Sequence, residues 1–316
     1  MHSLPDIHDL AGLDALRAEV DLWQPAVAAV ARAHGLPHDS LVDLGGGNLV
    51  VGAGNEHVIK LTPPVFAHEL EAESDALSRI SGALPIDTPQ LCAVGMRDGW
   101  SYIVLTRLRG RTLRDCWGEV PSLERLEILR ALGAWLAALH ALPVPREGAL
   151  AVSWPTFVLA QTSLCGARQA RLGLPPNLIA GIPDCLDGAN LASASRLAML
   201  HADLTDQNVL IDKLDGSWRV SGIIDFGDAQ TGAPLYDMAA PALLIARGDR
   251  ALLGALLDGY GIPAADRNER LRLELTALAV LHRFNDMTRY LEWTDPPPAT
   301  LEEMGPVMFP LSPMAG

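Results

Sequence analysis

The chain has 316 residues, 49% of them hydrophobic, so it can bury a core large enough for one large domain or two smaller lobes. Its formal net charge of −14 argues against a nucleic-acid partner, because phosphate backbones are bound by clustered lysine and arginine. No apolar run approaches the roughly 20 residues of a membrane span, and residues 1–13 lack the basic and apolar segments of a signal peptide. We therefore expect a cytoplasmic protein with no membrane partner.

The acidic balance has two readings. It would attract a cationic substrate by electrostatic steering, or it would simply keep the protein soluble. The four cysteines stand far apart without a C-x-x-C pair, so the sequence suggests neither a zinc site nor a redox dithiol.

The first part of the chain, residues 1–108, combines helical segments with short β-prone runs. Residues 14–33 have helical periodicity. Residues 41–61 contain the runs LVDL, GGGN, LVV, GAGNE and HVIKL, which predict a strand, a glycine loop, a strand, a turn and a strand. Residues 67–80 are again helical and residues 101–108 are β-prone. We expect a small antiparallel sheet with one helix laid on it.

The remaining residues, 109–316, are mainly helical. A leucine-rich helix begins near Ser122 and ends near His140, and two β-prone runs, 208–211 and 219–224, flank a hairpin turn at Asp215-Gly216. Further expectations are short helices and loops over about 145–195 and helices over 252–260 and 271–290. The sequence thus predicts an α+β fold of two lobes, a β-rich N-lobe at 1–108 and a helical C-lobe at 109–316.

The strongest chemical signal is HADLTDQN at 201–208, followed after a hairpin by GIIDFG at 222–227. Phosphoryl transfer needs a carboxylate that accepts or orients the attacking hydroxyl and oxygen ligands that hold Mg²⁺ against the phosphates. Asp203 and Asn208 come from the first motif and Asp225 from the second. Each motif alone is a common structural turn, but the two together, in this order, favour phosphoryl transfer.

An upstream lysine fits the same chemistry. Lys60 ends the run HVIK, and a lysine on the third strand of such a sheet reaches the α- and β-phosphates and is held by a glutamate of the next helix. Glu69, Glu71 and Glu73 compete for that role. We favour Glu73, because Leu77 and Ile80, four and seven residues later, would lie on the same helix face, toward the sheet.

The glycine loop lies where a phosphate-covering loop would be expected. It comprises Gly45, Gly46, Gly47 and Asn48, between the first two predicted strands. The loop is neither a Walker A motif nor a full G-x-G-x-x-G, so backbone N–H groups would approach the phosphates without an adjoining helix N-terminus. A simple tight hairpin is nearly as good a reading.

These segments resemble the aminoglycoside phosphotransferase/choline kinase family, the small-molecule relatives of protein kinases. The resemblance rests on HADLTDQNVLI and VSGIIDFGDAQTG, and extends to YIVLTRLRGRTL and LGAWLAALHALPV. It implies a protein-kinase-like fold, with Asp203 as the catalytic base, Asn208 and Asp225 as Mg²⁺ ligands, and Lys60 as the phosphate anchor.

The resemblance also assigns supporting roles. The backbone around Leu105 and Arg107 would contact the adenine, and His201 would brace the catalytic loop through its ring nitrogens. The family usually has glycine where Ala202 stands, a difference of little bulk. The co-substrate is ATP or GTP, and the glycine loop leaves the choice between them open.

The acceptor is a small molecule on this reading. The chain reaches Tyr236-Asp237 almost directly after the GIIDFG motif, which leaves no activation segment on which a peptide could lie. We expect an O-phosphotransferase acting on an amino sugar or amino alcohol. The alternatives are a kinase of hydroxylated amino acids, such as homoserine or hydroxylysine, and an inactive nucleotide-binding module; a metal-dependent hydrolase built on His201 and Asp203 lacks further ligands.

Overall fold

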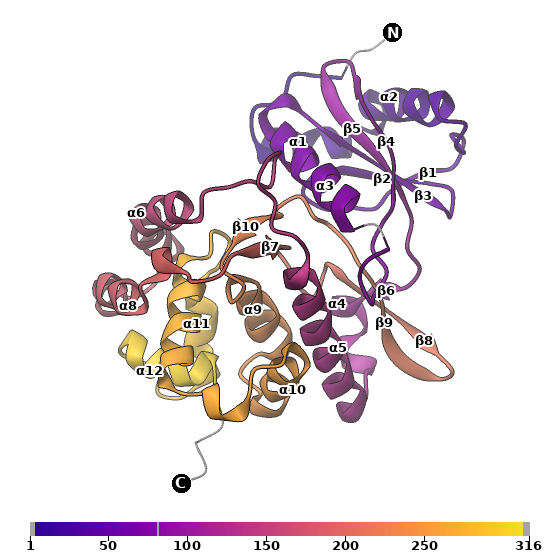
Figure 1. The fold of residues 1–316 in the computed structure, drawn as a ribbon. Coiled ribbons are helices and arrows are strands. Elements are labelled where there is room, and N and C mark those ends of the chain that lie inside the picture. The colour runs from indigo at the N-terminus through magenta and orange to yellow at the C-terminus, as the bar shows by residue number, and fades with distance from the viewer. Residues whose placement is uncertain (1–3, 81, 312–316) are drawn as a thin grey trace. The chain divides into compact units, whose positions relative to one another are not determined.

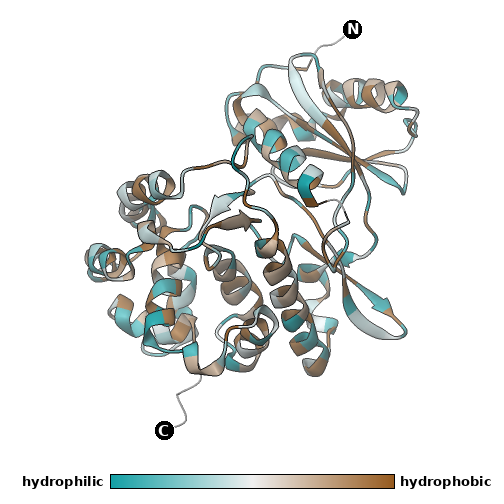
Figure 2. Cartoon of the chain, in the orientation of Figure 1, coloured by the Kyte–Doolittle hydropathy of each residue, from teal (hydrophilic) through white to brown (hydrophobic). Residues whose placement is uncertain are grey.

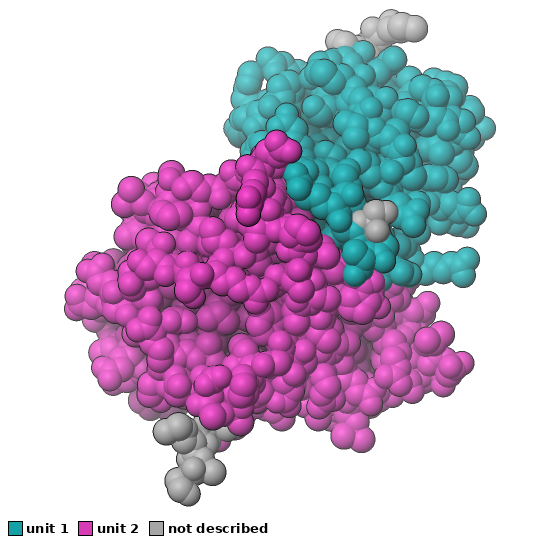
Figure 3. Space-filling view, viewed as in Figure 1, with its two compact units in different colours: residues 1–83, 87–109, 222–228 teal, residues 84–86, 110–221, 229–316 magenta. Residues whose placement is uncertain are grey.

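The computed structural model describes residues 4–80 and 82–311, which form two compact units (Figure 1). Unit 1 comprises residues 1–83, 87–109 and 222–228, and unit 2 comprises 84–86, 110–221 and 229–316 (Figure 3). The segment 222–228, which carries Asp225, is therefore grouped with the N-terminal residues. A backbone hydrogen bond within unit 1 holds it there, because the N–H of Ile223 donates to the carbonyl of Asp87 at 3.0 Å.

The sheet of unit 1 has five antiparallel strands in the order β1-β2-β3-β5-β4. The strands are β1 (Leu41–Asp43), β2 (Leu49–Ala53), β3 (His57–Thr62), β4 (Leu91–Arg97) and β5 (Trp100–Thr106). Apolar residues run through this sheet (Figure 2), as the β-prone runs predicted.

Helices pack on both faces of this sheet, not on one. The apolar side chains of α1 (Leu10–Ala18) and α2 (Val20–Ala33) share a core with one face, and α3 (Ala67–Ile80) contacts β4 and β5. The expected single helix over 14–33 is wrong in one respect: it is broken at Glu19, whose ψ of 68° is not helical. The indole of Trp23 donates to the carbonyl of Arg17 at 3.3 Å and so satisfies the end of α1.

Strand β3 shows how the sheet separates apolar and charged side chains. Successive side chains of a strand point to opposite faces. Ile59 and Leu61 belong to the core shared with α1 and α2, so Lys60 between them points to the other face.

Unit 2 is mainly helical. Its helices are α4 (Leu113–Cys116), α5 (Ser122–Ala141), α6 (Trp154–Leu172), α7 (Pro176–Ala180), α8 (Ile182–Ala189), α9 (Tyr236–Ala240), α10 (Arg250–Tyr260), α11 (Glu269–Leu281) and α12 (Leu301–Met308). Shorter turns include a 3-10 turn at Leu191–Ser193, a π-helical turn at Pro241–Ala246 and a 3-10 segment at Met287–Trp293.

Helices α5 and α10 lie backbone to backbone through two glycines. A Cβ added at Gly133 would collide with the carbonyl of Leu256, and one added at Gly259 would collide with the carbonyl of Arg130. This close approach places the end of α10 beside the middle of α5, from where the side chain of Tyr260 reaches His140 near the end of α5.

Two helix expectations in unit 2 need correction. The segment 145–195 was expected to contain only short helices, but α6 runs for 19 residues, because Pro155 sits in its first turn, where a missing N–H costs nothing. The expected helix over 271–290 ends at Leu281. His282 has a ψ of 125°, and a separate 3-10 segment follows from Met287.

Short strands complete unit 2. They are β6 (Arg111–Thr112), β7 (Ala198–Leu200), β8 (Val209–Leu214), β9 (Ser217–Ile223), whose last residues enter unit 1, and β10 (Gln230–Gly232). Asp215 and Gly216 join β8 to β9 with φ angles of 51° and 84°, the geometry of a tight hairpin turn, as predicted. Across residues 4–80 and 82–311, no helix has the length and apolar character needed to cross a bilayer.

Candidate active site

Lys60 of β3 lies between two carboxylates of unit 1. Its Nζ is 2.8 and 2.7 Å from the two carboxylate oxygens of Glu73 on α3, and 2.9 Å from Oδ1 of Asp225. The side chains of Lys60 and Glu73 are 9% and 1% exposed, whereas that of Asp225 is 42% exposed. The cluster therefore has a buried end at Glu73 and an open end at Asp225.

The other two glutamates of α3 have different surroundings. Glu69 accepts a hydrogen bond from Nδ2 of Asn48, and Glu71 is exposed. The helical period of this segment predicts Glu73 as the partner of Lys60. Glu73 is the glutamate of α3 that forms this ion pair.

The charges of this cluster are mutually dependent. Burial acts against the ammonium of Lys60, but the carboxylates of Asp225 and Glu73 together outweigh it and raise the lysine pKa. Burial raises the pKa of Glu73, and the nearby Lys60 opposes this effect. Lys60 is thus firmly charged, and two carboxylates against one ammonium leave the cluster with an excess of negative charge when both are ionised.

Asp225 stands at a strained turn. Its φ of 68° lies in the left-handed region, which costs a non-glycine residue about 1–2 kcal/mol. The following Phe226 is 1% exposed and anchors the turn by packing. Strain of this kind persists only where neighbouring contacts enforce it, and such residues cluster at functional sites.

The glycine loop is tied down at its ends. Gly45 donates its N–H to Oδ1 of Asp43 at 2.9 Å, and the Arg17 guanidinium of α1 donates to the carbonyls of Gly46 and Asn48. The Asn48 side chain is buried, and Oγ1 of Thr62 donates to its Oδ1 at 2.9 Å. Asn48 therefore fixes the loop to β3 and α3, while the glycines form its outer part.

The predicted adenine contacts lie at the end of β5. Leu105 is buried within the sheet, and the N–H of Arg107 donates to the carbonyl of Glu56 at 2.7 Å. The guanidinium of Arg107 donates to the carbonyl of Gly54 at 3.1 Å. A nucleotide base at this position would therefore have to use backbone atoms other than this N–H.

In unit 2, Asp203 and Asn208 hold each other across the predicted catalytic loop. Nδ2 of Asn208 donates to the carboxylate Oδ2 and to the carbonyl of Asp203, both at 2.8 Å. The amide nitrogen of Asn208 is committed to these bonds, so its amide oxygen is the atom suited to a cation. Nδ1 of His201 accepts from the N–H of Asp203 at 3.2 Å, which braces the loop through a ring nitrogen.

A buried carboxylate supports the same loop from beneath. Asp237 of α9 is 2% exposed and accepts from the N–H groups of His201 at 2.8 Å and Ala202 at 2.7 Å. Nε2 of His140 donates to it at 3.0 Å. Three donors satisfy this buried anion, as a buried charge requires.

Ala202 occupies a position where glycine would be unstrained. Its φ is 64°, so the difference from the family pattern concerns backbone conformation more than bulk. The strained residue is held from both sides: Asp237 accepts from its N–H, and Nε2 of His282 donates to its carbonyl at 3.2 Å. Burial lowers the pKa of His282 to about 4, so the ring is neutral near pH 7.

Asp206 of the loop is not available to a substrate. It is 4% exposed, and the guanidinium groups of Arg114 and Arg247 donate to its two oxygens at 2.8 and 3.3 Å. Sequence reasoning did not find Arg114, Arg247 or His282, because no motif surrounds them.

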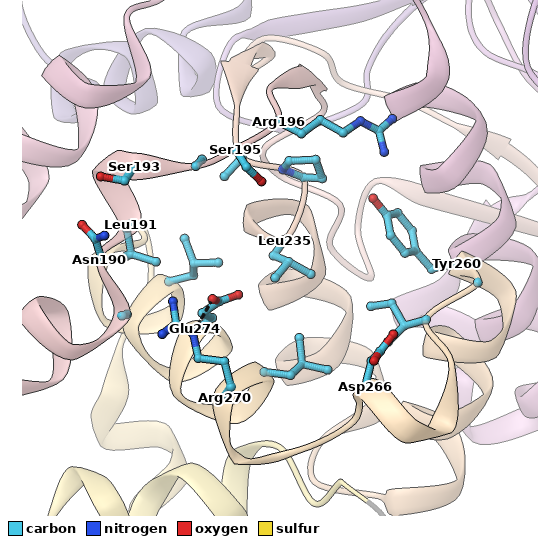
Figure 4. Close-up of a pocket in the computed structure, with 18 of the residues that line it drawn as sticks. Asn190, Leu191, Ser193, Ser195, Arg196, Leu235, Tyr260, Asp266, Arg270 and Glu274 are labelled. Atoms are coloured by element: carbon cyan, nitrogen blue, oxygen red, sulfur yellow. Dashed lines mark hydrogen bonds and ion pairs between the residues drawn. The ribbon is translucent and has the colours of Figure 1, made fainter.

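Unit 2 also contains a cavity of about 520 Å³ (Figure 4). Its walls come from residues 189–196, the loop 233–235, residues 260–266 at and after the end of α10, and one side of α11. Four leucines line it, and its charged residues are Arg196, Asp266, Arg270 and Glu274. The lining includes no residue of the 201–208 loop.

Comparison with known proteins agrees with this chemistry. The sequence profile of the phosphotransferase enzyme family matches residues 45–275. Viomycin phosphotransferase of Streptomyces vinaceus is 28% identical over 189 residues, which cover 55% of this chain and 62% of that protein. Lysine-specific demethylase JMJ21 of Arabidopsis thaliana is 26% identical over 207 residues, 52% of this chain and 22% of that protein. The chain thus spans less than two thirds of each of these relatives.

Solved structures share the fold at low sequence identity. The GDP complex of wild-type aminoglycoside 2'-phosphotransferase-IIIa has a TM-score of 0.62 at 21% identity and covers 90% of this chain and 97% of that one. The streptomycin-ATP-APH(2")-IIa ternary complex has a TM-score of 0.60 at 15% identity, with the same coverage. The macrolide 2'-phosphotransferase MphH from Brachybacterium faecium has a TM-score of 0.55 at 19% identity and covers 82% and 90%. These likenesses establish the predicted protein-kinase-like α+β fold.

Proposed function

Since the chain belongs to the phosphotransferase enzyme family, we propose that it transfers the γ-phosphoryl group of ATP or GTP to a hydroxyl of a small molecule. The observation that carries this proposal is the lysine cluster: Lys60 of the sheet is held at once by Glu73 and by Asp225. A charged lysine fixed in this way is what binding of nucleotide phosphates requires. A buried ion cluster contributes little net stability, because desolvation offsets the attraction of its charges, so this arrangement favours a functional role.

Asp203 acts as the base in this proposal. As the acceptor oxygen attacks the γ-phosphorus, its O–H bond breaks and the proton passes to the Asp203 carboxylate. The new P–O bond forms while the bond from the γ-phosphorus to the bridging oxygen breaks, and the nucleoside diphosphate leaves. The bond from Asn208 keeps the Asp203 carboxylate oriented before the acceptor binds.

The donor set suits Mg²⁺. Asn208 offers an amide oxygen and Asp225 a partly exposed carboxylate, and a hard cation prefers this mixture of oxygen ligands. Bound there, Mg²⁺ would neutralise charge on the phosphate oxygens. Lys60 would contact the α- and β-phosphates, and the N–H groups of the glycine loop would cover them.

The acceptor that we propose is an amino sugar or amino alcohol. Viomycin and aminoglycoside phosphotransferases are among the relatives and structural neighbours, and the formal charge of −14 suits a cationic substrate. Only β10 and a short turn separate Asp228 from α9, which leaves no platform for a peptide. A hydroxylated amino acid is the alternative acceptor. A cytoplasmic location, where nucleoside triphosphates are abundant, fits the four free cysteines.

The test is an acceptor panel. The protein is incubated with Mg-ATP or Mg-GTP and with aminoglycosides, amino alcohols, homoserine or hydroxylysine, and nucleoside diphosphate and phosphorylated product are measured by mass spectrometry. We expect acceptor-dependent turnover with one class. Asp203→Asn should lower kcat about 10²- to 10⁴-fold while nucleotide affinity stays unchanged.

A nucleotide-binding module without activity is the outcome that would contradict this function. It would bind nucleotide in a thermal-shift assay, show no acceptor-dependent release of diphosphate across the panel, and behave identically as Asp203→Asn.

A further inference from the structure

A chain of hydrogen bonds leads from the cavity of unit 2 to the catalytic loop. Tyr260, the last residue of α10, lines the cavity (Figure 4) and its hydroxyl lies 2.9 Å from Nδ1 of His140. His140 in turn contacts Asp237 through Nε2, and Asp237 accepts from the backbone N–H groups of His201 and Ala202. Every link falls between 2.7 and 3.0 Å.

The chemistry of the partners gives the chain a direction. The carboxylate of Asp237 only accepts, so Nε2 of His140 carries the hydrogen. In the tautomer with hydrogen on Nε2, Nδ1 is an acceptor, and the hydroxyl of Tyr260 donates to it. Burial raises the pKa of Tyr260 to about 12, so this hydroxyl keeps its proton at neutral pH.

The loop that receives this support is under strain. Ala202 holds a left-handed φ of 64° two links away from His140. Its conformation persists because Asp237 accepts its N–H, and Asp237 is held in turn by His140. A change in the orientation of the His140 ring would therefore act on the residue directly before Asp203.

The packing of two helices fixes the outer link. Gly133 and Gly259 let α5 and α10 approach with their backbones in contact, and Tyr260 follows Gly259 directly. The rings of His140 and Tyr260 pack edge to face, with centroids 5.6 Å apart. The hydroxyl is thus positioned by rigid elements.

We propose that Tyr260 is a positioning residue for the phosphoryl transfer described above, acting from the cavity wall through His140 and Asp237 on the catalytic loop. This inference rests on the proposed function. Without the hydroxyl, Nδ1 of His140 has lost its donor, and the tautomer with hydrogen on Nδ1 becomes accessible. That tautomer turns a lone pair toward the Asp237 carboxylate and weakens its hold on the loop.

Tyr260→Phe tests the inference, because it removes one oxygen and keeps the ring. We expect kcat to fall about tenfold, since misplacement of a catalytic group by about 1 Å can cost about 10²-fold and this variant should shift the loop by less, while KM for the nucleotide stays within about twofold. Tyr102→Phe is the matched control. Tyr102 is half-buried like Tyr260, and its hydroxyl also lies beside a histidine, 3.1 Å from Nε2 of His34, but within unit 1, so kcat should not change.

A double variant tests whether the effect of Tyr260 on kcat passes through His140. In His140→Gln the chain is already broken, so adding Tyr260→Phe should lower kcat no further. Equal losses in both backgrounds, or an unchanged kcat in Tyr260→Phe, would overturn the inference.

Amide hydrogen exchange tests the same chain without turnover. Tyr260→Phe should speed exchange at the N–H groups of His201 and Ala202 about tenfold relative to wild type, and Tyr102→Phe should not. If the wild type proves inactive with every acceptor, the proposed function fails, but this exchange difference would still support the chain. Unchanged exchange at both amides would refute it.

Discussion

The two units hold their chemistry-bearing residues by different means. In unit 1, Lys60 is fixed by charge, between the carboxylates of Glu73 and Asp225. In unit 2, the loop before Asp203 is fixed by hydrogen bonds from backbone N–H groups to Asp237, and by the side chains of His140 and His282. The difference fits the roles that we propose for the two regions. A lysine that contacts phosphates would have to stay charged, whereas a loop that presents a carboxylate would have to keep its shape.

The contrast also predicts which changes should destabilise each unit. Removing one charge from the cluster of unit 1 leaves buried charge without compensation. In unit 2, the stability should fall instead when a buried histidine is protonated or when a single hydrogen-bond acceptor is lost.

Lys60→Met should have the largest effect. It leaves the buried Glu73 beside Asp225 without a cation, and breaking such a pair costs about 3–5 kcal/mol of unfolding free energy. Urea denaturation at pH 7 measures it. Adding Glu73→Leu should recover part of the loss. Lys213→Met, at an exposed lysine of β8, is the control, and an equal effect of the two lysine variants would contradict a buried, compensated cluster.

His282 should make stability depend on pH. Its folded pKa of about 4 lies below the unfolded value of 6.5, so the unfolded state takes up the proton first as the pH falls. The stabilising contribution is complete above pH 6.5 and is lost between about 6.5 and 4, by about 3 kcal/mol in all. Urea titrations over this range should show a steeper loss for the wild type than for His282→Gln. Parallel curves would mean that His282 is not buried as a neutral ring.

Asp237→Asn should cost about 2 kcal/mol, because its amide NH₂ must face one of the N–H groups of His201, Ala202 or the His140 ring and leave it unsatisfied. Asp249→Asn provides the control. Asp249 caps α10 with a single oxygen, which asparagine also has, so stability should change by only a few tenths of a kcal/mol. Thermal unfolding of both variants makes the comparison, and equal melting temperatures would argue against the role given to Asp237.

Ala202→Gly should have the smallest effect and the opposite sign. Glycine adopts the φ of 64° without strain, a gain of about 1–2 kcal/mol that its greater freedom in the unfolded chain partly offsets, so the variant should be about 0.5–1 kcal/mol more stable. Ala134→Gly, in the exposed interior of α5, should instead lose about 1 kcal/mol. The same sign for both substitutions in urea denaturation would contradict strain at Ala202.

The elements that could be predicted from sequence are those set by local composition and period. Strands β2 and β3 lie in β-prone runs separated by a glycine-containing turn, and Glu73 could be singled out from three glutamates because α3 has a clear apolar face. The fold itself was predicted from the resemblance and is confirmed. The roles of Asp203, Asn208, Asp225 and Lys60 remain predictions.

What the sequence did not reveal depends on tertiary packing. Tyr260 meets His140 across 120 residues of chain, and Arg247 meets Asp206 across 41, without any motif around them. The strain at Ala202 was equally hidden, because a backbone angle imposed by Asp237 and His282 leaves no trace in composition. The length of α6 was not predicted, because a proline breaks a helix interior but is tolerated in the first turn, where Pro155 lies.

The two glycines between α5 and α10 limit how this sequence can change. At most core positions a larger side chain is accommodated when a neighbour becomes smaller, but at Gly133 and Gly259 the obstacle is main chain, which no neighbouring substitution can shrink. Exchanges tolerated elsewhere in the helices should therefore be rejected at both positions. In a library of random variants selected only for folding, these two sites should stay invariant although neither carries a reacting group.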